Sequence, residues 1–193
     1  WQLVASNIGT SYSWTPPVAT LAPYMTNAAS GGGTILVETY NGGTYVGGVE
    51  KDVTFVVPSS AGPTLTNITA VETETAVNTL IGKYVQNLSK IKFDLGTRTA
   101  QYGATITKSE IILASVSHTG TTWTSDTINQ SGNVVVTGKV TDSRGLTNEK
   151  TVTVNLLAYQ PPAVTKFTVD RAQSNGTLDI LGTYAKSISQ ATV

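Results

Sequence analysis

A β-hairpin pattern that occurs twice is the sequence feature that most constrains the fold. In residues 131–156 apolar and polar residues alternate along two segments that can form the arms of a hairpin. The residues that this alternation places on one face are Val134, Val136, Val140, Val152 and Val154. A period of two in β-branched residues is typical of half-buried antiparallel strands. The turn between the arms, Asp142–Gly145, ends in a glycine that can adopt a positive φ. We therefore expect this segment to form a hairpin.

The same pattern occurs roughly one hundred residues earlier, a distance close to the length of an immunoglobulin-like domain. Residues 30–56 match residues 131–155, with two extra residues expected in the loop Gly43–Gly48. Residues 81–89 also align without gaps on residues 181–189. The repeat predicts an all-β chain of tandem immunoglobulin-like β-sandwiches, each of about 100 residues.

Two proline-containing segments, Pro58–Pro63 and Pro161-Pro162, mark the expected boundaries. We expect a β-sandwich domain at 1–60 that can be incomplete at its start, a complete immunoglobulin-like sandwich at 63–160, and the opening strands of a further unit at 163–193. No segment shows a convincing 3.6-residue period, so little helix is expected. The start at Trp1, without Met or a signal-peptide pattern, is typical of an excised fragment.

The composition excludes several classes of partner. The net charge is zero and only 12% of the residues are charged, so neither a basic footprint for nucleic acid nor a charged membrane-binding face is expected. No apolar run approaches the ~18 residues of a membrane helix. Cysteine is absent, which rules out disulfides and thiol chemistry.

The residues that could carry catalysis or bind metal are few. His118 is the single histidine, and we expect it to be a solvated loop residue. A zinc site needs three or four ligands, and the turn Asp142–Gly145 lacks the alternating oxygen ligands of a calcium loop. The carboxylates are scattered, and Lys108 and Glu110 share one face of a predicted strand where both are expected to be solvated. We expect no enzyme activity, no catalytic residue, no bound metal and no cofactor.

Aromatic residues are the remaining candidates for binding. Trp123, Tyr45 and Tyr40 are the predicted ligand-binding residues, because exposed aromatic rings stack on sugar faces. Tyr40 and Tyr45 flank a glycine-rich stretch. The alternative for Trp123, as for Trp14, is packing in the core or at a domain edge, since a sandwich usually buries one tryptophan.

Several segments together resemble a known family of phage proteins. They lie in both units: Tyr12–Pro17, Thr34–Gly43, Phe55–Ser60, Tyr84–Gln86, Lys90–Lys92, Tyr102–Ile106 and Gly138–Gly145. The chain is similar over most of its length to minor structural proteins of tailed phages of Gram-positive bacteria, long tail-tip or baseplate proteins with tandem immunoglobulin-like domains. The resemblance implies a virion component that takes part in host attachment, outside the cell, with no enzyme activity in these domains. It also implies that the outer ends of the long protein, where assembly or receptor contacts lie, are absent from this chain.

Three functions remain open after these observations. The first is a structural spacer of a phage tail or baseplate protein, with other tail or baseplate proteins as partners and a homo-oligomeric state in the particle. The second is a carbohydrate-binding module for host cell-wall polysaccharide, favoured by an exposed aromatic cluster. The third is a domain of a bacterial surface adhesin, which a cell-wall sorting signal would favour.

Overall fold

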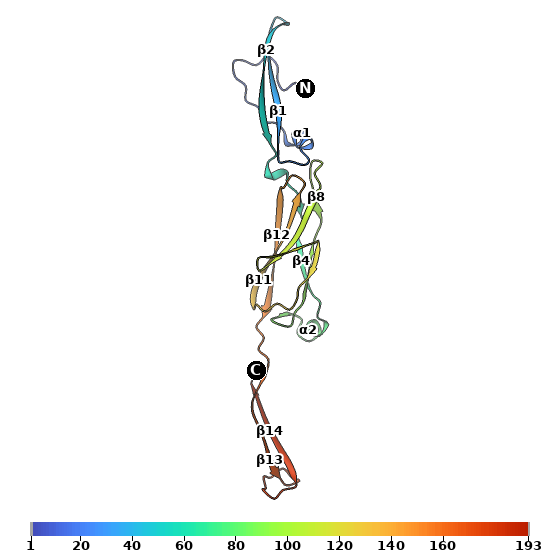
Figure 1. Cartoon of the computed structure of the whole chain (residues 1–193). Coiled ribbons are helices and arrows are strands. Elements are labelled where there is room, and N and C mark those ends of the chain that lie inside the picture. Colours follow the sequence, from blue (N-terminus) through green and yellow to red (C-terminus); the bar gives the residue numbers. More distant parts are fainter. Residues whose placement is uncertain (1, 193) are drawn as a thin grey trace.

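The chain is almost entirely β-structure. A computed structural model describes residues 2–192, with 51% of the residues in strands and 8% in helices. The expectations of an all-β chain and of little helix are confirmed. Figure 1 shows three parts in a row: a long hairpin near the N-terminus, a central unit of two sheets, and a second long hairpin near the C-terminus. Within the described residues, no helix is both long and apolar enough to cross a membrane.

The N-terminal hairpin pairs β1 (Ser30–Asn41) with β2 (Thr44–Val56) along their whole length. Its turn is the pair Gly42-Gly43, with φ values of 58° and 95°. The prediction of a loop at Gly43–Gly48 is therefore wrong, because residues 44–48 belong to β2. Two glycines with positive φ close the tightest kind of hairpin turn, so the extra residues join the ladder and produce a register shift between Thr39 and Tyr40.

Short helical segments lie on either side of the N-terminal hairpin. They are α1 (Val18–Leu21) and the 3-10 turn η1 (Ala22–Tyr24) before it, and the 3-10 turn η2 (Ser59–Ala61) after it. A proline in an extended backbone conformation precedes each of α1 and η2, with ψ values of 132° and 155°. The turn η2 connects the hairpin to the central unit, and α1 lies beside the base of the hairpin (Figure 1).

The central unit contains two main sheets. The smaller sheet has the order β10-β6-β4, and the larger has the order β5-β12-β11-β8-β9. Their strands are β4 (Ile68–Glu72), β5 (Tyr84–Val85), β6 (Ile91–Leu95), β8 (Ile106–Leu113), β9 (Val116–Thr119), β10 (Thr122–Thr124), β11 (Gly132–Asp142) and β12 (Thr147–Leu157). A small pair, β3 (Thr64–Leu65) with β7 (Arg98–Thr99), and the helix α2 (Thr75–Leu80) complete the unit. Only β5 and β12 pair in parallel among these strands of the described chain.

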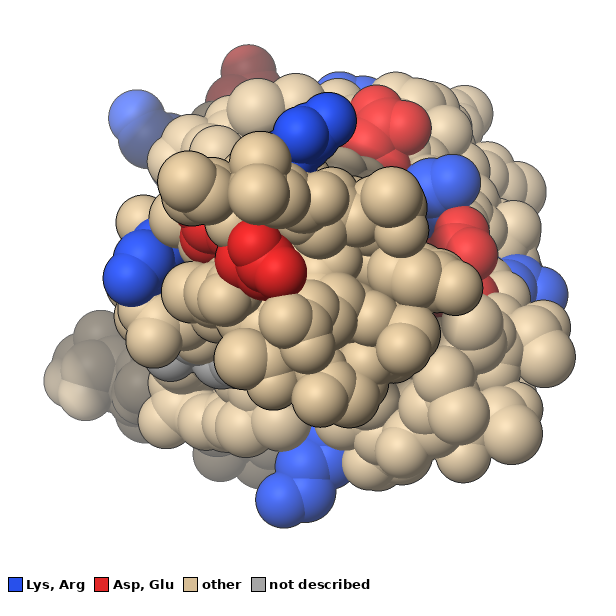
Figure 2. All heavy atoms as spheres, turned by 90° about the horizontal axis from the view of Figure 1, so that it is seen from below, with Lys and Arg blue, Asp and Glu red and all other residues tan. Residues whose placement is uncertain are grey.

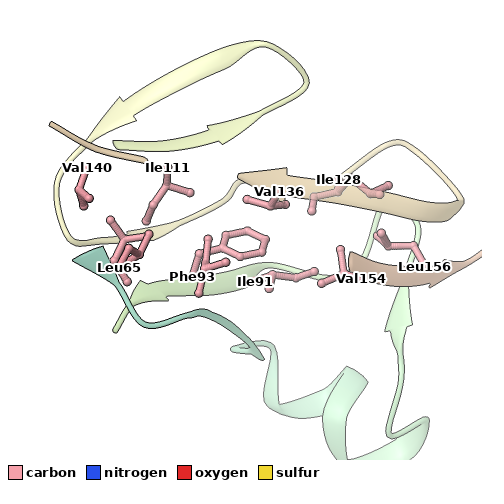
Figure 3. Packing of buried hydrophobic residues seen from close by; sticks show 12 residues of the cluster. Leu65, Ile91, Phe93, Ile111, Ile128, Val136, Val140, Val154 and Leu156 are labelled. Carbon is pink, nitrogen blue, oxygen red and sulfur yellow. The ribbon is translucent and has the colours of Figure 1, made fainter. Parts of the chain in front are cut away.

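The core lies between the two sheets, as Figure 3 shows. Phe93 and Ile91 from β6 are fully buried and pack with Val136 of β11 and Val154 of β12. The predicted alternation is present, since Val136 is 0% exposed whereas its neighbour Val135 is 55% exposed. Each such buried side chain stabilises the fold by about 1.5–3 kcal/mol relative to an exposed one.

The C-terminal hairpin pairs β13 (Ala163–Ala172) with β14 (Tyr184–Thr192). The intervening loop is ordered locally, with Gln173 Nε2 donating to Asp179 Oδ2 at 2.9 Å. Figure 1 shows this hairpin at the end of the molecule opposite to β1 and β2.

Glu110 differs from the expectation of two solvated side chains, whereas the side chain of Lys108 is 51% exposed, as expected. Glu110 accepts from Lys108 Nζ at 2.7 Å and from Ser117 Oγ at 2.6 Å, and its side chain is only 12% exposed. The reason is that β9 folds back along β8 and covers the carboxylate. Both contacts lower the pKa of Glu110, with the Lys108 hydrogen bond as the larger cause and the Ser117 hydrogen bond as the second.

Candidate functional site

Two of the three predicted binding residues lie together at the tip of the N-terminal hairpin. Tyr40 of β1 and Tyr45 of β2 are directly opposite each other, with ring centroids 5.7 Å apart in an edge-to-face arrangement at 67°. Their exposed fractions are 55% and 56%. The register shift beside Thr39 sets this pairing, because it moves Tyr45 by one position relative to the rest of β2. The result is an exposed pair of aromatic rings beside the Gly42-Gly43 turn.

A carboxylate adjoins the aromatic pair. The Tyr40 hydroxyl donates to Glu38 Oε2 at 3.2 Å, since the two side chains lie on the same face of β1 two residues apart. This hydrogen bond raises the pKa of Tyr40, because ionisation of the phenol would remove the donor and place two negative charges together. Exposed rings with a neighbouring carboxylate and hydroxyl are groups that stack on and hydrogen-bond to sugars.

Trp123 lies apart from the tyrosines, in β10 of the central unit. It is opposite Phe93 of β6, and the two rings are nearly parallel at 16° with centroids 5.9 Å apart. His118 stacks on Trp123 at 3.7 Å and 12°, and the tryptophan is partly buried against the core. The expectation of a solvated loop histidine is wrong, because His118 belongs to β9 and covers the indole ring. A ligand role of Trp123 stays a prediction.

The structure also shows a site that the sequence reasoning missed, a buried ion pair in the β11–β12 turn. Arg144 donates to Asp142 Oδ2 from Nε at 3.0 Å and from Nη2 at 2.7 Å, and both side chains are 0% exposed. Asp142 Oδ1 accepts the backbone N–H groups of Arg144 and Leu146, each at 3.0 Å. These bonds satisfy most of the hydrogen-bonding capacity of the carboxylate and fix the shape of the turn.

The same arginine reaches the linker that precedes the central unit. Its Nη2 donates to the carbonyl oxygens of Ala61 at 2.7 Å and Gln101 at 3.2 Å. Gln101 Nε2 in turn donates to the carbonyl oxygen of Gly62 at 3.0 Å. We call Asp142, Arg144 and Gln101, with the linker carbonyls that they bind, the linker junction.

Apolar side chains pack around the linker junction. They come from the N-terminal part of the chain and from the central unit: Val18, Ala22, Met25, Val57, Ala61, Tyr102 and Leu146. Gly62 has no room for a side chain, because a Cβ would lie 2.9 Å from the carbonyl oxygen of Ser59. The Ser143 hydroxyl also donates to the carbonyl oxygen of Thr26. The sequence does show an aspartate and an arginine in this turn. Charged residues in turns are usually solvated, so the burial of Asp142 and Arg144 could not be inferred from the sequence.

Potential metal ligands and charged side chains are spread over the described chain. Within residues 2–192, no group of three or more His, Cys, Asp or Glu side chains could hold a metal ion. Figure 2 shows that the face seen from below carries Lys and Arg side chains interspersed with Asp and Glu, and no large patch of one sign. The candidate sites are therefore the tyrosine pair and the linker junction.

Comparison with known proteins places the chain in a phage family. No curated protein matches the chain. A protein-family profile matches residues 1–188, almost the whole chain. The match confirms a phage protein and suggests a virion component, whereas the tail-tip or baseplate position and the Gram-positive host stay predictions. The chain belongs to the family described as "Siphovirus protein of unknown function (DUF859)".

Proposed function

We propose that the chain is a non-enzymatic spacer of a phage tail-tip or baseplate protein that takes part in host attachment. In this proposal it contains an incomplete β-sandwich unit at 1–60, a complete immunoglobulin-like β-sandwich at 63–160 and the opening strands of a further immunoglobulin-like unit at 163–193. Its partners are other tail or baseplate proteins, and several copies assemble in the particle on the outside of the virion. The linker junction is the observation that carries the proposal.

The linker junction supports a spacer because it fixes one part of the chain relative to the next. A linker of small residues and prolines would otherwise allow the central unit to swing. Here the guanidinium of Arg144 and the amide of Gln101 bind two successive carbonyl groups of that linker. Burial in a low-dielectric environment strengthens these bonds, and a buried donor that loses its partner costs free energy. The N-terminal hairpin is thus held in line with the central unit (Figure 1).

The spacer can be tested by solution scattering. We expect the wild-type chain to give one maximum dimension that does not change with temperature below unfolding. Arg144→Met should broaden the distance distribution, whereas Arg171→Met, at an exposed arginine of the C-terminal hairpin, should leave it unchanged. A broad distribution already present in the wild type would contradict a rigid spacer.

The position in the virion needs a separate test. Antibodies raised against this chain and bound to gold should label the tail end of intact virions in negative-stain electron microscopy. Labelling of the capsid, or labelling only of disrupted particles, would contradict the tail-tip or baseplate assignment.

A second candidate function is binding of host cell-wall saccharide. The exposed Tyr40–Tyr45 pair at the free end of the β1–β2 hairpin favours it, because stacking on an aromatic ring does not require a deep pocket. Saturable binding to purified wall polysaccharide, lost in Tyr40→Ala and Tyr45→Ala but kept in Tyr24→Ala, would support this function. Tyr24 is 87% exposed and serves as the matched control. Equal binding by all variants would refute it.

A further inference from the structure

We infer that the central unit bears tension along the chain, and that the linker junction divides this tension between its two sheets. This role rests on the proposed spacer function, because a spacer between a virion and a cell is pulled at both of its ends. The two linkers, at 58–63 and 158–162, and every strand between them lie within the described residues.

The chain enters the central unit at one end and leaves it at the other (Figure 1). The incoming chain forms β3 and then β4 of the smaller sheet, and the outgoing chain leaves from β12 of the larger sheet. A pull on the two linkers therefore acts on these strands along their own axes. Because the hydrogen bonds of an antiparallel ladder are perpendicular to the strands, such a pull loads all bonds of a ladder together.

The outgoing strand β12 is held on both of its sides. It forms ten antiparallel register pairs with β11, along residues 147–156. On its other side the end of β12 pairs in parallel with β5, and the Gln86 N–H donates to the carbonyl oxygen of Leu157 at 2.9 Å. A pull from the C-terminal side is thus resisted by two ladders.

The side chains of β12 prevent the strand from sliding. Val154 and Leu156 are buried in the core. Asn155 between them is exposed and donates from Nδ2 to Asn133 Oδ1 of β11 at 2.6 Å. A slip by one residue moves every side chain of a strand to the opposite face of the sheet. It would bring Asn155 into the core, so the ladder and the core packing have to break together.

The incoming strand is also held along its length. β3 pairs with β7 and β4 pairs with β6, in both cases antiparallel. Between these pairs the Thr66 N–H donates to the carbonyl oxygen of Thr97, and the Gly96 N–H donates to that of Asn67, each at 3.0 Å. One ladder therefore runs along residues 64–72, and the whole of it resists a pull from the N-terminal side.

The linker junction adds a second path for tension from the N-terminal side. Arg144 lies in the β11–β12 turn, is bound to Asp142 of that turn, and donates to the carbonyl oxygen of Ala61 in the linker before β3. Tension that reaches Ala61 therefore acts on the larger sheet through Arg144 before it reaches β3. Both charged side chains are 0% exposed, and their low-dielectric surroundings strengthen these bonds. Without this contact only the β3–β4 ladder would receive the tension directly.

Single-molecule force spectroscopy on the whole chain tests this role. The chain has no cysteine, so two introduced cysteines define where the force acts. Ser60→Cys with Gln160→Cys, both at exposed positions, applies the force along the strands. Unfolding between these tethers should lengthen the chain by about 300 Å, which identifies the event as that of the central unit.

A second pair of tethers provides the matched control. Gln130→Cys with Gln160→Cys applies the force across the end of the β11–β12 hairpin opposite to its turn, where both positions are exposed. In this direction the ten register pairs break one after another. The rupture force should be at least about twofold higher along the strands than across the hairpin. Both double variants should keep the wild-type free energy of unfolding, so the direction of the force alone differs.

A third tether position tests the division of tension. Thr64→Cys with Gln160→Cys pulls on β3 directly and leaves the linker junction outside the loaded segment. The rupture force should be lower with this pair than with the tether at Ser60. Arg144→Met should lower the force more with the tether at Ser60 than with the tether at Thr64, where only its loss of stability acts. Arg171→Met, which lies outside all tethers, should change neither force.

The outcomes separate the load-bearing role from the spacer itself. A rupture force along the strands that is no higher than the force across the hairpin would overturn the load-bearing role. Equal forces with the tethers at Ser60 and Thr64, or an equal effect of Arg144→Met on both, would overturn the division of tension. Either result beside a single maximum dimension in solution scattering would leave the spacer standing, because a spacer can be rigid without resisting force.

Discussion

Replacement of Arg144 by methionine should destabilise the central unit more than any single exposed substitution. The change removes the ion pair with Asp142 and the bonds to the carbonyls of Ala61 and Gln101. Asp142 remains 1% exposed with its charge opposed only by backbone N–H groups. Loss of one partner of a buried ion pair typically costs about 3–5 kcal/mol. This is a large part of the ~5–15 kcal/mol that stabilises an ordinary domain.

Urea unfolding followed by tryptophan fluorescence measures this effect, since Trp123 packs against the core of the central unit. With a slope of about 1–3 kcal/mol per molar urea, the midpoint of unfolding should fall by roughly 1–5 M. Arg171→Met is the control, because Arg171 is exposed and makes a single hydrogen bond at 3.3 Å to a backbone carbonyl. It should change the free energy of unfolding by no more than about 0.5 kcal/mol.

A double-mutant cycle then isolates the ion pair. Asp142→Asn keeps an oxygen acceptor for the backbone of the turn but leaves the guanidinium of Arg144 unpaired. The double variant Asp142→Asn with Arg144→Met buries no charge, so its loss should be smaller than the sum of the two single losses by about 1–3 kcal/mol. Additive losses, or an Arg144→Met variant within about 0.5 kcal/mol of the wild type, would refute a stabilising buried pair.

Three further predictions concern the core, the Glu110 ion pair and the hairpin tip. Gly138→Ala should lower the free energy of unfolding by about 1–3 kcal/mol, because the new Cβ would collide with Leu95 in a filled core. Glu110→Gln should cost about 1 kcal/mol at pH 7 by urea unfolding. Since the pKa of Glu110 is lowered in the fold from its ordinary 4.5, this contribution exists above pH 4.5 and should disappear as the pH falls through the folded pKa. Glu38→Gln should lower the raised pKa of Tyr40 towards 10.0 in a titration of tyrosinate absorbance.

Matched substitutions serve as controls for these three changes. Gly32→Ala meets no atom within 4 Å and should leave the free energy of unfolding unchanged. Glu149→Gln breaks an ion pair whose carboxylate is 50% exposed, so it should have little effect on the free energy of unfolding at pH 7. Glu50→Gln lies on the same hairpin and should leave the titration of Tyr40 unchanged. An equal effect of a variant and its control would contradict the corresponding prediction.

The strands could be predicted from sequence because each depends on a local pattern. The period of two in the valines of β11 identified the strand and its buried face, and Val136 and Val140 are both fully buried. The turn at Asp142–Gly145 also followed from local residue chemistry. The structure of residues 43–48 could not be predicted in this way, because such residues can either form a loop or lengthen the two strands. The Gly42-Gly43 pair decides this by closing the turn first.

The charged and aromatic contacts could not be predicted because they depend on how the strands and the linker pack together in the folded chain. Arg144 bonds to Ala61, which precedes it by 83 residues. Glu110 is covered by β9, and His118 stacks on Trp123 only because the smaller sheet brings β10 beside it. In each case a charged or polar residue that is usually solvated lost its solvent through tertiary packing. Exposure is a property of the assembled sheets, and no local pattern reports it.

The two repeated hairpins differ in the side chains of their turns, and this difference changes what each turn can bind. In β11–β12 the turn carries Asp142 and Arg144, whose side chains form the ion pair that holds the preceding linker. In β1–β2 the aligned residues are Asn41 and Gly43, and a glycine has no side chain with which to bind a linker. Tyr40 and Tyr45 occupy the strand positions beside that turn and stay exposed. An Asp-x-Arg turn should therefore mark a rigid joint in any further repeat of this kind, whereas a Gly-Gly turn should mark a hairpin whose tip is free to contact another molecule.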